Sequence, residues 1–198
     1  MKELRCTLIL MRHAAAEGAG RFQGQRDTPL SARGRRQLAE LAPKLSKYRI
    51  QTVYSSDLSR ARATAAAAGR KFGLKLETRP GLREMNFGCW QGLPWGRIAK
   101  RYPRLADLWV RRFPNQVIPG AEHFDDFRKR VEEELRDLVS ANEGRCVLVV
   151  THAGVIRVAL ASALGMPQRN LFRLGQDPCA INVIDHFQDG VLVRCVNG

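Results

Sequence analysis

Two short apolar runs with β-branched members constrain the fold of this chain, because each ends directly at a histidine. Leu4–Met11 is followed by Arg12-His13, and Arg145–Val150 is followed by Thr151-His152. Continuous apolar runs of this length are typical of strands that are buried on both faces of a parallel sheet. Segments with helical spacing alternate with the strand-like segments, which favours helices on both faces of the sheet. We therefore predict an α/β fold, a three-layer αβα sandwich with a mostly parallel central sheet.

The remaining patterns fill in the order of elements along the 198 residues. We expect strands at 51–55 and 74–78, and two more over 181–196, joined at Gln188-Asp189-Gly190. We expect one helix from Ser31, a plausible N-cap, in which Leu38, Leu41 and Leu45 have helical spacing. We expect further helices over 57–71, over 124–139, and from 154 to 164. The stretch from about 80 to 119 is irregular and contains the three tryptophans. We expect one domain over residues 1–198, with a helical or irregular insertion at about 80–119 that covers a site.

The two histidines point to the chemistry that the fold would support. Ligands of open α/β sheets bind at the carboxyl ends of strands, so neighbouring strands would turn both imidazoles toward one pocket. Arg12 at such a strand end would be costly to bury unless an anion pairs with it. Histidine can act as a nucleophile, arginine pairs bidentately with phosphate, and a glutamic acid can protonate a leaving group. Taken alone, however, His13 is more often a satisfied core histidine.

Charge and cysteine usage narrow the class of protein further. The formal net charge is +14, but the basic residues are spread along the chain without an aromatic-interleaved motif. This favours a solvated surface that attracts small anions over a nucleic-acid-binding role. The five cysteines are scattered and lack a Cys-x-x-Cys pair, so we expect buried hydrophobes and no zinc site. The chain has no apolar run long enough for a membrane span and no secretory pattern at Met1, so we expect a cytoplasmic protein.

Five segments in a fixed order resemble the motifs of the histidine phosphatase, or phosphoglycerate mutase-like, superfamily. They are Leu10–Ala14, Arg21–Ser31, Ser55–Ala61, Leu82–Gly92 and Val149–Arg157. The pair Arg12-His13 alone is weakly specific, but the ordered set spans nearly the whole chain. The resemblance implies the phosphoglycerate mutase-like fold. Ala14 replaces the glycine of the commonest signature, and its carbonyl can still orient the ring of His13.

The resemblance also implies a role for each matching residue. His13 attacks phosphorus and becomes a phosphohistidine, while Glu84 protonates the leaving oxygen and then activates water. The phosphoryl oxygens are held, and their charge stabilised, by Arg12, Arg60 and His152. The expected substrate-binding residues are Gln23, Gly24, Gln25 and Ala153. No metal and no cofactor are implied, and the partner is a small phosphomonoester.

The resemblance leaves the exact activity open. Mutases carry Glu-Arg-His-Tyr-Gly where this chain has Glu84–Gly88, which favours a phosphatase, although Trp109–Arg112 resembles a mutase arginine pair. Leu82–Gly92 and Pro119–Glu122 look most like α-ribazole-5′-phosphate phosphatases, and such sequences are often broad phosphatases. The three tryptophans either stack on a ring-bearing leaving group or pack within the insertion. A non-enzymatic anion- or nucleic-acid-binding protein is the remaining alternative, and the sequence does not decide between a monomer and a homodimer.

Overall fold

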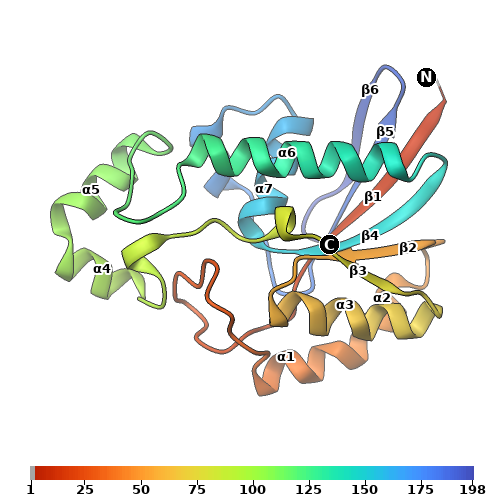
Figure 1. Cartoon of the computed structure of the whole chain (residues 1–198), viewed down its shortest axis with the longest axis horizontal. Coiled ribbons are helices and arrows are strands. Elements are labelled where there is room, and N and C mark those ends of the chain that lie inside the picture. Colours follow the sequence, from red (N-terminus) through yellow and green to blue (C-terminus); the bar gives the residue numbers. More distant parts are fainter. Residues whose placement is uncertain (1–2) are drawn as a thin grey trace.

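A central β-sheet organises the protein, whose computed structural model describes residues 3–198 (Figure 1). Met1 and Lys2, part of the start that shows no secretory pattern, lie outside the described residues. Within 3–198 the sheet has six strands in the order β3-β2-β4-β1-β5-β6. Their bounds are β1 Leu4–Arg12, β2 Thr52–Ser55, β3 Leu76–Thr78, β4 Arg145–Thr151, β5 Ile181–Phe187 and β6 Gly190–Cys195. The first four strands in this order run parallel, and β5 pairs antiparallel with β1 on one side and with β6 on the other. The predicted mostly parallel sheet is therefore confirmed.

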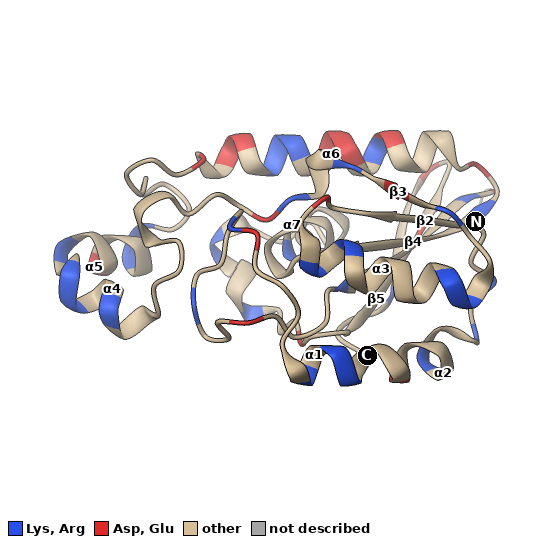
Figure 2. Cartoon of the chain, turned by 60° about the horizontal axis from the view of Figure 1, so that its bottom comes forward, with Lys and Arg blue, Asp and Glu red and all other residues tan. Residues whose placement is uncertain are grey.

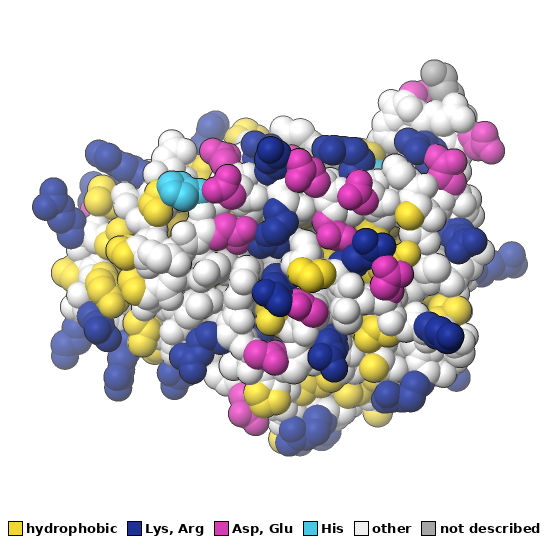
Figure 3. All heavy atoms as spheres, viewed as in Figure 1, with side chains coloured by type: hydrophobic (Ala, Val, Ile, Leu, Met, Phe, Trp, Pro, Cys, Tyr) yellow, Lys and Arg dark blue, Asp and Glu magenta, His cyan; other side chains and the backbone are white. Residues whose placement is uncertain are grey.

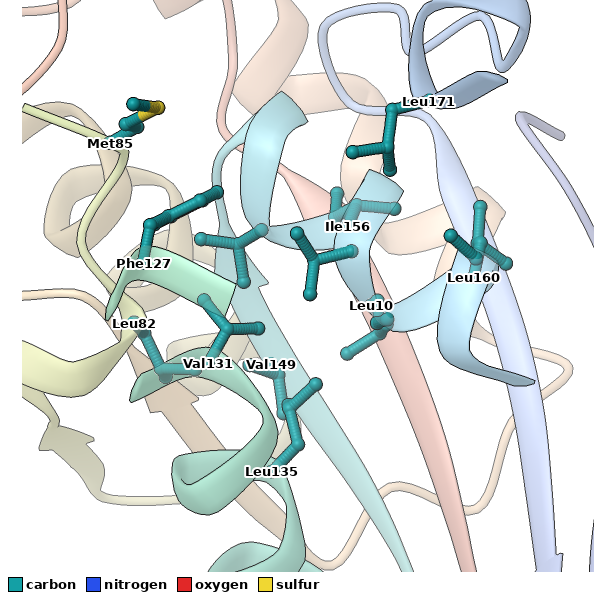
Figure 4. Packing of buried hydrophobic residues seen from close by; sticks show 14 of the residues in the cluster. Leu10, Leu82, Met85, Phe127, Val131, Leu135, Val149, Ile156, Leu160 and Leu171 are labelled. Carbon is teal, nitrogen blue, oxygen red and sulfur yellow. The ribbon is translucent and has the colours of Figure 1, made fainter. Parts of the chain in front are cut away.

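Helices cover both faces of the sheet, as the three-layer prediction requires (Figure 1). The helices are α1 Ala32–Gln37, α2 Leu41–Leu45, α3 Ser59–Phe72, α4 Trp95–Arg101, α5 Pro103–Arg112, α6 Phe124–Ala141 and α7 Ala153–Ala163. On one face, Leu10 and Val149 of the sheet pack against Phe127 of α6 and Ile156 of α7 (Figure 4). On the other face, a second apolar cluster joins the sheet to α2 and α3. The middle of the sheet is buried on both faces, which explains why the sequences of β1 and β4 are largely apolar.

The predicted helix after Ser31 is correct at its start and wrong in its continuity. The Ser31 hydroxyl accepts a hydrogen bond from the Gly34 amide at 3.1 Å, which confirms the N-cap. Beyond α1, however, the chain passes through a 3₁₀ turn over Leu38–Glu40 before α2 begins. Pro43 has no amide hydrogen to donate and crowds the carbonyl four residues earlier, so a continuous α-helix is disfavoured there.

The pairing of β1 with β4 positions the two histidines. Arg12 lies opposite Thr151 in the parallel register, and the His13 amide donates to the Thr151 carbonyl at 2.9 Å. His13 and His152 are therefore side by side at the carboxyl edge of the sheet. The sequence did not establish whether these two strands are neighbours, and in the structure β1 pairs directly with β4.

The segment from about 80 to 119 forms 3₁₀ turns at Pro80–Leu82 and Gly88–Trp90, followed by α4 and α5. Trp90 and Trp109 are buried with their ring centroids 5.5 Å apart, while Trp95 is partly exposed. The tryptophans therefore pack within this segment and with its neighbours. We propose that the whole chain is one domain with this segment as an insertion, because the segment shares an apolar cluster with the sheet.

The excess of positive charge is distributed over the molecule. Lys and Arg lie on the helices of both faces, and on α6 they alternate with acidic residues (Figure 2). The face in Figure 3 shows basic and acidic side chains interspersed over its middle, and mainly basic ones at its left end. In residues 3–198, the structure contains no helix with both the length and the apolar character needed to cross a membrane.

Candidate active site

A cavity of about 690 Å³ lies at the carboxyl ends of β1 and β4. Seven of the predicted site residues line it: Arg12, His13, Gln23, Gly24, Arg60, Glu84 and Ala153. They come from the end of β1, the loop after it, α3, the segment after β3 and the start of α7. Segments far apart in the sequence thus meet at one opening, as expected for a ligand site of an α/β sheet.

The His13 ring is held in one tautomer by its neighbours. Its Nδ1 lies 2.7 Å from the Ala14 carbonyl oxygen, which can only accept, so Nδ1 carries the proton. Its Nε2 accepts a hydrogen bond from Nε of Arg60 at 3.2 Å, so the lone pair is on Nε2. The expectation that the Ala14 carbonyl orients the ring in place of a glycine carbonyl is confirmed. Nε2, the ring nitrogen that does not contact the Ala14 carbonyl, is therefore the one with a lone pair.

Burial keeps this imidazole neutral. Burial is the largest cause that lowers the pKa of His13 to about 3, and the positive charge of Arg60 adds to it. At neutral pH the side chain is therefore an uncharged nitrogen base, the form that can attack an electrophile.

His152 lies next to His13, with ring centroids 5.1 Å apart and ring planes at 60°. Its Nε2 is 2.7 Å from the Ser56 hydroxyl, whereas its buried Nδ1 has no hydrogen-bond partner among residues 3–198. Burial, followed by the neighbouring His13, lowers its pKa well below the usual range. The side chain does not contribute to the cavity lining itself. An unpaired polar atom at this depth is costly.

Arg60 holds the loop that frames the cavity. It is 1% exposed, and its two terminal nitrogens each donate to a backbone carbonyl, at Gly24 and Arg26, at 2.7 Å. Arg12 is held from the other side by the carbonyl of Gln176, and its buried Nε has no partner among the described residues. Within residues 3–198, neither guanidinium has a carboxylate oxygen within 4.0 Å. Two cations thus flank His13 without a close ion pair to a carboxylate in the described residues.

Glu84 reaches the cavity from the opposite side. One carboxylate oxygen accepts from its neighbour's amide, Met85, at 2.9 Å, and the other accepts from Gly154 at 3.0 Å. Gly154 lies in the first turn of α7, where amide hydrogens and the helix dipole favour an acidic group. A Cβ atom on residue 154 would lie 2.1 Å from Glu84 Oε1, so glycine leaves the space that the carboxylate occupies.

The predicted substrate-binding residues divide into two groups. Gln23, Gly24 and Ala153 line the cavity. Gln25 does not line it: its side chain donates to the Glu84 carbonyl at 3.1 Å, and its amide donates to Gln91 at 2.7 Å. Gln25 therefore ties the loop after β1 to the segment that carries Glu84.

Some cavity residues were not assigned a role from the sequence. Arg157 lies within the matched segment Val149–Arg157 and follows His152 by five residues, a spacing that could have drawn attention to it. Phe22, Phe87 and Phe172 supply the aromatic wall, and none of the three tryptophans lines the cavity. Ser56 stands within the matched segment Ser55–Ala61, and only its contact with His152 shows what it does.

Cysteine and metal chemistry find little support in the described residues. Burial raises the pKa of the Cys6, Cys146 and Cys179 thiols to about 11, so they are protonated at neutral pH. No disulfide occurs in residues 3–198, and Cys89 is exposed. The same part of the chain contains no group of three or more His, Cys, Asp or Glu side chains arranged to hold a metal ion.

Comparison with known proteins agrees with this geometry. Residues 8–198 match the model of the histidine phosphatase superfamily (branch 1), so the chain belongs to this superfamily. A bifunctional protein of Mycobacterium tuberculosis is 34% identical over 194 residues, which are 96% of this chain and 53% of that protein. The chain therefore spans about half the length of this relative.

Two further relatives match over most of their length. Phosphoserine phosphatase 1 of Hydrogenobacter thermophilus is 30% identical over 179 residues, 89% of this chain and 85% of that protein. The α-ribazole phosphatase structure from Shigella flexneri superposes with a TM-score of 0.87 at 27% identity, covering 97% of this chain and 96% of that one. The predicted superfamily and fold are confirmed.

Proposed function

We propose that this protein is a metal-independent phosphomonoester hydrolase that works through a phosphohistidine at His13. The observation that carries the proposal is the orientation of the His13 ring. Its Nδ1–H is fixed on the Ala14 carbonyl, and its lone-pair nitrogen lies beside Arg60 at the cavity. This is the arrangement that an attacking imidazole needs, with a cation next to the position of the phosphoryl oxygens.

The first step forms a bond from His13 Nε2 to phosphorus and breaks the bond between phosphorus and the ester oxygen. Glu84, as the carboxylic acid, gives its proton to the departing oxygen. Arg12, Arg60 and His152 stabilise the charge on the three equatorial oxygens of the phosphoryl group. Arg12 and Arg60 line the cavity, which supports their part in this assignment, and the part of His152 rests on its matched segment and its place beside His13.

The second step regenerates the protein. Glu84, now a carboxylate, takes a proton from water while the water oxygen attacks phosphorus and the bond to Nε2 breaks. Inorganic phosphate leaves, His13 returns to its neutral tautomer and Glu84 is again protonated. One water is consumed, and neither step requires a redox partner.

We propose that the substrates are small phosphomonoesters, with α-ribazole-5′-phosphate the first specific candidate. The resemblance of Leu82–Gly92 to such phosphatases and the structural similarity to one of them support this choice. Comparing kcat/KM for α-ribazole-5′-phosphate with values for common sugar phosphates tests it. Equal values would contradict the specific assignment and leave a broad phosphatase.

The mutase alternative depends on a pair of arginines that do not reach the site. Arg111 and Arg112 are exposed on α5 and do not line the cavity, and Arg111 pairs with Asp107 at 2.7 Å. The nucleic-acid-binding alternative depends on net charge alone, and that charge is distributed over several elements (Figure 2). Neither has a specific structural observation in its favour.

Hydrolysis of p-nitrophenyl phosphate in the presence of excess chelator tests the proposal. We expect chelator-resistant activity in the wild type and its loss in His13→Ala. Full activity of the variant would show that His13 is not the nucleophile. Activity that disappears with chelator would contradict the metal-independent mechanism.

A further inference from the structure

The cavity carries more positive charge than a phosphoryl group requires. Five arginines line it: Arg12, Arg21, Arg33, Arg60 and Arg157. The acidic residues of the lining are Glu17 and Glu84. Across residues 3–198, none of the five guanidinium groups has a carboxylate oxygen within 4.0 Å. The first chemical step also needs Glu84 in its uncharged form, which increases the excess of positive charge.

Three of the cavity arginines do not flank His13, and Arg157 is the least exposed of them. Its Nε donates to the Leu174 carbonyl at 2.9 Å, and its guanidinium lies 5.5 Å from the ring centroid of Phe172. Arg21 and Arg33, in contrast, are exposed. The terminal nitrogens of Arg157 have no hydrogen-bond acceptor in the described part of the chain. They therefore remain available, in fixed positions, for a planar anion to bind bidentately.

The position of Arg157 assigns it to the leaving group. Arg60 contacts the attacking nitrogen of His13, whereas Arg157, in α7, lines the same part of the cavity wall as Glu84, the predicted proton donor. Arg157, Glu84, Phe87 and Phe172 also line a smaller adjoining pocket of about 60 Å³. The alcohol released by protonation from Glu84 would leave past this group of side chains. A charged substituent on that alcohol would meet Arg157 first.

We propose that Arg157 binds a second anionic group, a carboxylate or a phosphate, on the leaving alcohol. It is then a specificity-determining residue, and the preferred substrates are phosphomonoesters of anionic alcohols. This inference rests on the proposed phosphatase activity. It is an alternative to the α-ribazole-5′-phosphate assignment, since that leaving group has no second anion, and the substrate comparisons decide between the two.

A matched pair of substrates tests the inference. 3-Phosphoglycerate and glycerol 3-phosphate have the same carbon chain length and differ in a carboxylate against a hydroxymethyl group. We expect the wild type to prefer 3-phosphoglycerate by about tenfold or more in kcat/KM, the order associated with a hydrogen bond to a charged group. In Arg157→Gln this preference should disappear, mainly through KM, because the lost contact is made in both the ground state and the transition state. Fructose 1,6-bisphosphate against fructose 6-phosphate repeats the comparison for a second phosphate.

Two variants separate specificity from folding and from general charge. Arg173→Gln removes the same charge from an exposed site outside the cavity and should leave the preference intact. Arg157→Lys keeps the charge but not the planar guanidinium group, and it should retain part of the preference. This variant provides the test if Arg157→Gln does not fold. An equal kcat/KM for both substrates in the wild type, or an equal loss on both in Arg157→Gln, would overturn the role of Arg157. If the wild type hydrolyses neither substrate nor p-nitrophenyl phosphate, the phosphatase proposal itself fails.

Discussion

Arg60 donates a hydrogen bond from its Nε to Nε2 of His13 across 3.2 Å. The contact joins two groups that the sequence places on separate elements, the end of β1 and the first turn of α3. It keeps a cation beside the nitrogen that carries the lone pair, and it favours the neutral form of the ring. Each prediction below depends on this pair or on the side chains that fix its surroundings.

The depressed pKa of His13 predicts a loss of stability in acid. The folded-state pKa is about 3, below the ordinary value of 6.5, so the unfolded chain binds more protons between these values. Stability is full above pH 6.5 and falls as the pH decreases toward 3, by about 1.4 kcal/mol per pH unit for this histidine. Denaturant titrations at pH 7 and pH 5 should show a loss about 2 kcal/mol larger in the wild type than in His13→Asn. An equal loss would mean that His13 is protonated normally.

Replacing Glu84 by glutamine should affect substrates according to their leaving groups. The amide keeps the shape of the side chain but cannot give up a proton, and general acid catalysis contributes about 10²- to 10⁴-fold. We expect kcat/KM, which reports the first step, to fall by about that factor for glycerol 3-phosphate and much less for p-nitrophenyl phosphate, since p-nitrophenolate leaves without a proton. The kcat values should fall for both substrates, because Glu84 also activates water in the second step. Glu17→Gln, on the wall of the same cavity, is the control for loss of charge alone. Equal losses of kcat/KM on both substrates would exclude Glu84 as the proton donor of the first step.

Gly154→Ala should displace the Glu84 carboxylate from its position at the start of α7. The added Cβ would lie 2.1 Å from Glu84 Oε1 and 3.3 Å from Phe127, so the carboxylate must leave its position. We expect kcat on alkyl phosphates to fall at least tenfold. Gly96→Ala in α4, where an added Cβ meets no atom within 4 Å, should retain activity and raise Tm slightly. Wild-type kinetics in Gly154→Ala would show that the position of Glu84 is not critical.

Ser56→Ala should separate the positioning of His152 from simple burial. The variant removes the hydroxyl 2.7 Å from His152 Nε2 and leaves a buried ring without its partner, at a cost of about 1–3 kcal/mol. Ser55→Ala removes a neighbouring buried hydroxyl that bonds only to a backbone carbonyl. We expect both variants to lose stability, and Ser56→Ala alone to lose kcat by about tenfold or more. An equal loss of kcat in the two variants would argue against a role of Ser56 in positioning His152.

Strands β1 and β4 could be predicted from the sequence because they are buried on both faces and therefore appear as continuous apolar runs. The order of the strands could not, since pairing depends on contacts distant in the chain, and only the register of Arg12 with Thr151 joins the two histidines. The break between α1 and α2 was missed although Pro43 signals it, because the leucine spacing continues across it.

The predicted site residues came mainly from the motifs, and the structure adds what short motifs cannot contain. Gln25 carries a polar side chain of the kind that binds substrates, but in the structure this side chain donates a hydrogen bond to the backbone carbonyl of Glu84. Arg157 resembles any helical arginine in sequence. Its fixed guanidinium, held by the Leu174 carbonyl and the ring of Phe172, becomes visible only after the chain has folded.

The central claim, that His13 becomes phosphorylated, is tested most directly by trapping the intermediate. The protein is mixed with ³²P-labelled phosphomonoester, quenched in alkali within milliseconds to seconds, digested and analysed by mass spectrometry. We predict an acid-labile, alkali-stable phosphoryl group on Nε2 of His13 in the wild type and none in His13→Ala. A label on His152, or rapid hydrolysis by a His13→Ala variant that carries no label, would contradict the account.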